Sequence, residues 1–256
     1  MRQFSDPIKL VGTNGDRFVI SPMTEADIVP LASIYRKAWI RRDMARRVLD
    51  AGSPMSFEKA GGMFLIQDAE SLAHLLDDPS EFVWVARAGN QPLGALWCGL
   101  NDEKYQNPSC ILPQNGFETL PGYIESGLSN GTLYFSKEII ITPDQRGRGL
   151  PEALIDTSMR FFYARGYQQS CGEVYYVHTM CDDKGEHAVG LFNGASFRML
   201  LRTGCRLEGE FPPCVIHADG FEALISMRIV RWDLEPSLEA AKEMLLAAGM
   251  SMEKYV

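Results

Sequence analysis

One stretch near the middle of the chain constrains the fold most: an apolar strand that leads into a proline, a Gly/Arg-rich loop and a helix start. It reads Glu138-Ile-Ile-Ile-Thr-Pro-Asp-Gln-Arg-Gly-Arg-Gly-Leu-Pro-Glu-Ala-Leu154. Glycine lets backbone N–H groups approach a ligand closely, and a helix start presents unpaired N–H groups and the positive end of the helix dipole. Arg146 and Arg148 add charge suited to a diphosphate. The stretch therefore predicts an anion-binding turn.

Strand and helix patterns continue on both sides of this stretch. Two hairpins are expected first, Ile8–Val11 with Arg17–Ser21 and Phe82–Ala88 with Pro92–Leu100. A variant capping box, Thr24-Glu25-Ala26-Asp27, begins a helix between them, and 43–80 suggests further helix. The elements expected later are strands at Leu133–Thr142, Gly172–Thr179, Cys205–Glu210 and Glu222–Trp232, and helices at Leu150–Arg165, Leu191–Thr203 and about 235–249. Residues 101–130 suggest a long irregular connection, either a functional loop or a surface insertion.

Composition narrows the range of partners and compartments. The 256 residues carry a formal charge of −8, which disfavours nucleic acid and anionic membrane as partners. No apolar run approaches the roughly 20 residues that span a bilayer, and the N-terminus lacks the apolar stretch of a signal peptide. The six cysteines show neither close pairs nor metal-ligand spacing. We therefore expect a cytoplasmic protein without a metal.

The anion loop resembles the acyl-CoA signature of the GNAT superfamily. Arg146 to Leu150 match that signature position by position, and Pro151 stands where the family prefers Gly or Ala. The stretches Val19–Asp27, Phe82–Leu100 and Asn193–Cys205 resemble other parts of the family, so that the likeness covers about 16–232, with 101–130 as an insertion. The resemblance implies an α/β (α+β) fold over a single domain, 1–256. Its mixed, mostly antiparallel sheet of about seven strands would be flanked by helices and split at the acyl-CoA site.

The resemblance also implies where the acyl donor lies. The pantetheine arm of acetyl-CoA or another acyl-CoA would lie like a strand in the gap beside the strand that ends at Thr142. A backbone N–H near Ile141 would hold the thioester carbonyl. The implied cofactor-binding residues are Ile139, Ile140, Ile141, Thr142, Arg146, Gly147, Arg148, Gly149, Leu150, Pro151, Asn193 and Ser196.

Acylation of an amine needs a group that takes a proton from the amine. Glu138 is the carboxylate on the strand before the loop, where many family members place a base, and desolvation among isoleucines would raise its pKa. In a regular strand the family's usual base would align with Phe135 or Lys137, whose side chains alternate with that of Glu138. A β-bulge in this strand would change which side chains face the cleft. The tyrosine that usually acts as general acid in this family aligns with Leu200 here. His178, Tyr175 and Tyr176 are the alternative candidates for the general acid. Structural roles for the two predicted catalytic residues, Glu138 paired with Lys137 and His178 as an ordinary strand residue, remain open.

The acyl group and the acceptor are less defined. Transfer to a small-molecule amine or amino-acid-like acceptor is the leading interpretation. The segment from Phe197 to Gly209 is similar to acyl-homoserine-lactone and N-acyl amino acid synthases, which would imply longer acyl chains and acyl carrier protein as a donor. A non-catalytic acyl-CoA-binding module is the third interpretation, since the usual Tyr is missing. The sequence leaves open whether the chain forms a homo-oligomer.

Overall fold

A large mixed sheet organises the molecule in the computed structural model, which describes residues 7–11, 16–38, 67–182, 185–192, 194–218, 221–237, 243 and 251–252. Twelve strands of these residues join one sheet in the order β12-β1-β2-β3-β4-β6-β7-β11-β9-β5, with β10 on β11 and β8 on β7. The strands are β1 (Ile8–Val11), β2 (Arg17–Pro22), β3 (Glu81–Ala88), β4 (Gln91–Gly99), β5 (Leu112–Pro113), β6 (Leu133–Ile141), β7 (Gln169–Asp182), β8 (Gly185–Phe192), β9 (Arg206–Glu210), β10 (Cys214–Ala218), β11 (Phe221–Asp233) and β12 (Ser251–Met252). The helices are α1 (Ile28–Ala38), α4 (Ala69–Asp77), α5 (Leu120–Ser129), α6 (Leu150–Tyr163) and α7 (Gly194–Arg202).

Both predicted hairpins form. β1 pairs with β2 and β3 pairs with β4, each antiparallel. The capping box is confirmed as well: the Asp27 carboxylate accepts from the Thr24 N–H at 2.8 Å, and a short 3-10 turn there leads into α1. Asp27 also receives hydrogen bonds from the Arg87 guanidinium, which ties the start of α1 to β3.

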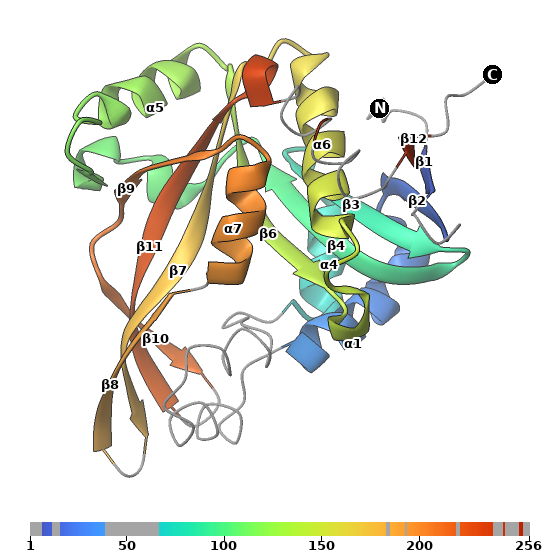
Figure 1. The fold of residues 1–256 in the computed structure, drawn as a ribbon, viewed down its shortest axis with the longest axis horizontal. Coiled ribbons are helices and arrows are strands. Elements are labelled where there is room, and N and C mark those ends of the chain that lie inside the picture. Colours follow the sequence, from blue (N-terminus) through green and yellow to red (C-terminus); the bar gives the residue numbers. More distant parts are fainter. Residues whose placement is uncertain are drawn as a thin grey trace.

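The two central strands, β6 and β7, run parallel and then separate. They pair only from Leu133 opposite Gln169 to Ser136 opposite Gly172. Beyond that point β6 remains paired with β4, whereas β7 remains paired with β11 and acquires β8 at its far end. Figure 1 shows the two strands starting side by side and then diverging. The sheet is therefore split next to the strand that leads into the anion loop.

Helices cover both faces of the sheet. α6 and α7 pack on one face, over a core that includes Leu96, Tyr134 and Trp232. α1 and α4 pack on the opposite face against β3 and β4. The segment 101–130 packs on that same opposite face against β6, β7 and β11 (Figure 1). In the described part of the chain, no helix combines the length and apolar character that crossing a bilayer requires.

The segment 101–130 corrects one expectation, because it contains regular structure. It holds two 3-10 turns, the short strand β5 and the helix α5. Two glycines and a proline hid this helix from its sequence pattern. Pro121 is tolerated because it lies in the first turn. A Cβ on Gly127 would lie 2.9 Å from the Leu133 Cβ, so packing against β6 requires a small residue inside the helix.

Two further expectations were wrong in part. Leu191 and Phe192 were assigned to a helix but end the strand β8, so that the following helix begins at Gly194. β8 forms by pairing with β7, and its own sequence lacks an alternating pattern, which is why it was missed. The expected seven strands become twelve because β8 and short strands such as β5, β10 and β12 join the sheet. Much of 43–80, the Asn14-Gly15 turn and most of the predicted C-terminal helix lie outside the described residues.

Candidate functional site

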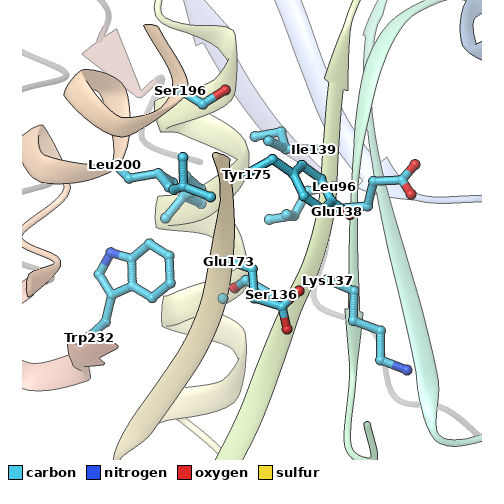
Figure 2. A pocket seen from close by; sticks show the side chains of 13 residues that line it. Leu96, Ser136, Lys137, Glu138, Ile139, Glu173, Tyr175, Ser196, Leu200 and Trp232 are labelled. Atoms are coloured by element: carbon cyan, nitrogen blue, oxygen red, sulfur yellow. The ribbon is translucent and has the colours of Figure 1, made fainter. Parts of the chain in front are cut away.

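A cleft opens where β6 and β7 part. It encloses about 650 Å³, part of which is open solvent. Its walls come from β4, β6, β7, α6, α7 and the end of β11, as Figure 2 shows. The lining residues are Leu96, Ser136, Lys137, Glu138, Ile139, Ile155, Gly172, Glu173, Val174, Tyr175, Ser196, Leu200 and Trp232. Ile139 and Ile155 belong to the strand and the helix that the anion loop connects, so the loop joins two walls of the cleft.

A β-bulge at Lys137 orients Glu138. Trp97 of β4 pairs with Glu138, but the next residue, Cys98, pairs with Ser136, which leaves Lys137 as the extra residue. The alternation of side chains between the two faces of the sheet therefore shifts by one residue at Lys137. Glu138 lies on the face covered by α1, near the Tyr35 hydroxyl, on the same face as Phe135. The bulge therefore places Glu138 on the face where a regular strand would not have placed it, as the sequence requires for a base at this position.

Lys137 has a different partner from the one suggested by the sequence. Its ammonium donates to Glu81 Oε1 at 2.6 Å, and the Trp97 indole N–H donates to Glu81 Oε2 at 2.5 Å. The ammonium also lies 4.9 Å from the centre of the Trp97 ring. Glu81 thus neutralises Lys137 and fixes the bulged residue, so Glu138 is left without that cation.

Burial raises the pKa of Glu138 to about 7, and nearby Tyr35, Gln67 and the Lys104 charge lower it only in part. Its Oε1 atom is fully buried and has no hydrogen-bond partner among the described residues. Burial, followed by the charge of Glu138, raises the pKa of Tyr35, so the phenol stays protonated and can donate. A carboxyl group whose pKa is close to neutral can accept a proton at physiological pH.

A second carboxylate borders the cleft from β7. The Glu173 side chain is 7 % exposed, and its Oε2 accepts from the Lys104 ammonium at 2.6 Å. Burial raises the pKa of Glu173, and Lys104 opposes that rise. Burial also raises the pKa of Tyr175, followed by the charges of Glu173 and Glu138, so Tyr175 lies near both carboxylates. Glu138, Glu173, Tyr175 and Lys104 therefore form one polar group on the α1 face of the split.

The anion loop has the conformation that its sequence predicts. Gly147 and Gly149 have φ of 74° and 76°, in the left-handed region that favours glycine. Among the described residues, no backbone carbonyl accepts from the N–H groups of Gly147, Gly149 or Leu150. These donors and the start of α6 can hold an anion.

The two arginines of the loop differ. Arg146 is half-buried, and desolvation lowers its pKa. Arg148 is exposed; it donates to Asp16 at 2.8 Å and to Gln145 at 2.6 Å.

Only some of the other residues that were predicted to bind the cofactor line the cleft. Ile139 and Ser196 line the cleft. Ile140 and Ile141 lie deeper, with side chains on opposite faces of β6. Thr142 closes the strand, its hydroxyl donating to the Leu93 carbonyl at 3.0 Å.

The start of α6 supplies the remaining predicted contacts. The Leu150 side chain is fully buried, so only its backbone can reach a ligand. Pro151 lies in the first turn of the helix. Asn193 lies outside the described residues.

His178 lies apart from Glu138. It is the extra residue of a bulge between β7 and β11, and its Nε2 lies 2.6 Å from the Ser226 hydroxyl. It does not belong to the residues that line the cleft. Leu200, where the family resemblance would put a Tyr, does line it. The catalytic assignment of His178 stays a prediction, with geometry that favours a structural role.

Sequence reasoning missed Glu173 and Tyr35. The available signal for Glu173 was the glycine before it, within an apolar strand. A Cβ on Gly172 would lie 2.9 Å from the Ser136 carbonyl oxygen and 3.2 Å from the Trp232 ring, so glycine permits the close approach at the base of the split. Tyr35 carried no signal, because its contact with Glu138 joins a helix and a strand about a hundred positions apart. In the described part of the chain, no cluster of His, Cys, Asp or Glu has the makings of a metal site.

Comparisons with known proteins bear on the fold. No protein-family model matches the sequence, and no curated protein matches it. Among solved structures, an N-acetyltransferase from Staphylococcus aureus Mu50 is similar with a TM-score of 0.52 at 13 % identity, covering 85 % of this chain and 99 % of that one. The protein smu.2055 from Streptococcus mutans UA159 is similar with a TM-score of 0.51 at 15 % identity, covering 84 % and 99 %. The split sheet, the anion loop and these likenesses together identify the fold of this chain as that of the GNAT superfamily.

Proposed function

We propose that the chain transfers an acyl group from a pantetheine thioester, with acetyl-CoA as the simplest donor, to an amine. The observation that carries this proposal is the cleft between β6 and β7, whose β6 wall leads directly into the anion loop at the start of α6. Ile139, Ile155 and Leu200 give the cleft apolar walls. The N–H groups of Gly147, Gly149 and Leu150 suit a diphosphate, so both parts of the donor find matching surfaces.

The residues of the chain would then act as follows. Acyl-CoA supplies an activated acyl carbon on a thiolate leaving group. Within the described parts of the chain, no strand pairs with β6 beyond Ser136 on its β7 side, so this backbone can hold the pantetheine arm. Glu138 takes a proton from the acceptor as the amine nitrogen forms a bond to the acyl carbon and the carbon–sulfur bond breaks. The thiolate takes a proton from solvent, because Leu200 offers none.

Binding of CoA tests the anion loop. Arg146→Ala and Arg148→Ala should each weaken CoA binding, by roughly 1.5–3 kcal/mol for an arginine that bonds directly to phosphate. The effect of Arg148→Ala should be the smaller, since it is exposed and already bound to Asp16. Arg165→Ala, an exposed arginine after the other end of α6, is the matched control. Unchanged affinity in both loop variants by calorimetry would contradict the assignment.

Turnover tests the reaction and separates the alternatives. Thiol release is measured with acetyl-CoA and octanoyl-CoA over a panel of amines, in the wild type and in Glu138→Gln. Turnover with acetyl-CoA that is lost in the variant supports the proposal. Turnover only with the long acyl group, or only with acyl carrier protein, would support the N-acyl amino acid synthase type. Tight CoA binding without turnover on any amine would support a non-catalytic module, which the Leu200 side chain in the cleft favours.

A further inference from the structure

We propose that Glu173 binds an ammonium group of the acceptor, so that the preferred acceptor is a small diamine. One amino group would lie beside Glu138, neutral and ready to attack, while the other remains charged against Glu173. This inference rests on the proposed function, because it assigns the acceptor of the same cleft.

The two carboxylates occupy matching positions on either side of the split. Ser136 and Gly172 are the last paired residues, and Glu138 and Glu173 follow them by two residues and one residue. Both side chains lie on the face covered by α1 and the segment 101–130. Tyr175 links them, because the charges of both carboxylates act on its hydroxyl and raise its pKa after burial does. A short aliphatic chain with an ammonium group at each end suits two carboxylates that share one neighbour.

Glu173 is oriented as a cation site and is already occupied by a cation. The Lys104 ammonium lies 2.6 Å from its Oε2 and 3.5 Å from Asp102. Glu173 lines the cleft, whereas Lys104 does not. Glu173, Asp102 and Lys104 together carry one net negative charge, so the group can accept a further ammonium. If that ammonium displaces Lys104, Lys104 keeps its contact with Asp102.

A buried polar atom of the cleft points to a ligand as well. Glu138 Oε1 is fully buried and has no hydrogen-bond partner among the described residues. Buried polar groups in native proteins are nearly always hydrogen-bonded, so this oxygen marks a position where a polar ligand binds.

The cleft is unsuited to an acceptor with a carboxylate. Lys137 is the single basic side chain among the described residues that line it, and Glu81 already neutralises Lys137. An acceptor carboxylate would face Glu138 and Glu173 without a free cation to compensate. The charges therefore select a diamine over an amino acid.

Matched amines and matched variants test the proposal. The assay is thiol release from acetyl-CoA at pH 8, with putrescine against butylamine. We expect kcat/KM for putrescine to exceed that for butylamine by about 10- to 100-fold, the effect of one charged hydrogen bond. Glu173→Gln should reduce this ratio to near one, mainly through KM. Lys104→Met, which removes the other half of the ion pair, should keep or increase the ratio.

The opposite effects of the two variants exclude a merely structural role. If both variants lower activity equally towards both amines, or if the wild type does not distinguish the amines, the proposal is wrong. Calorimetry of putrescine and butylamine binding to the wild-type CoA complex gives a second readout that needs neither variants nor turnover. Equal affinities there would overturn the diamine assignment. Failure of the proposed function looks different, as an absence of both CoA binding and thiol release with any amine.

Discussion

Glu138→Gln should stabilise the folded protein at pH 8 and leave its stability nearly unchanged at pH 5. Burial raises the pKa of Glu138 from 4.5 to about 7, against partial opposition from Tyr35 and Gln67. A carboxyl group with a higher pKa in the folded state binds its proton more tightly there than in the unfolded chain. The free energy of unfolding therefore falls as pH rises from about 4.5 to about 7, and it stays reduced above that window.

The size of the effect follows from the same shift. One pKa unit corresponds to about 1.36 kcal/mol, so the shift from 4.5 to about 7 corresponds to about 3 kcal/mol at pH 8. Residual exposure of Glu138 reduces this figure, and an amide N–H₂ at the buried Oε1 position would lack a partner, at a cost of about 1 kcal/mol. We expect Glu138→Gln to raise the free energy of unfolding by about 1–2 kcal/mol at pH 8.

Urea unfolding followed by tryptophan fluorescence at pH 5 and pH 8 measures this difference. The midpoint should rise at pH 8 in the variant while the slope stays constant. Glu125→Gln, at an exposed position of α5, is the matched control and should show no pH-dependent difference. The reasoning is refuted if Glu138→Gln changes stability equally at both pH values, or if it destabilises the protein at pH 8.

Three other outcomes follow from the site. In steady-state assays the wild-type kcat/KM should rise with pH through about 7 as Glu138 ionises; Glu138→Gln should lose this limb and fall by roughly 10²–10⁴-fold. Gly147→Ala should cost about 1–2 kcal/mol in thermal unfolding, because its φ is 74°, and should weaken CoA binding by calorimetry. Lys137→Met should cost about 3 kcal/mol in urea unfolding by leaving buried Glu81 unpaired, and adding Glu81→Gln should restore part of it. A pH profile that is the same in Glu138→Gln and the wild type would contradict Glu138 as the base. Unchanged unfolding of Gly147→Ala would contradict the strained backbone at that position. A double variant no more stable than Lys137→Met would contradict the role of the Lys137–Glu81 ion pair.

The anion loop could be predicted from sequence because its conformation depends on near neighbours. Left-handed φ at Gly147 and Gly149, and tolerance of Pro151 in the first helical turn, are properties of those residues. The hairpins and the capping box are local in the same way. Such features recur wherever the residues recur, and they include the motif whose resemblance to the GNAT signature implied the fold.

The arrangement around the cleft depends on contacts between distant segments. Lys104 and Glu173 are 69 positions apart, and Lys137 and Glu81 are 56 apart. The bulge that turns Glu138 towards α1 depends on how β6 aligns with β4, which no pattern within β6 specifies. α5 likewise forms because packing against Leu133 outweighs the poor helix propensity of its glycines and proline. Local propensity acts over a few residues, whereas strand register, burial and ion pairs are set only when the whole sheet assembles, and here these tertiary contacts bring the candidate catalytic and acceptor-binding groups together.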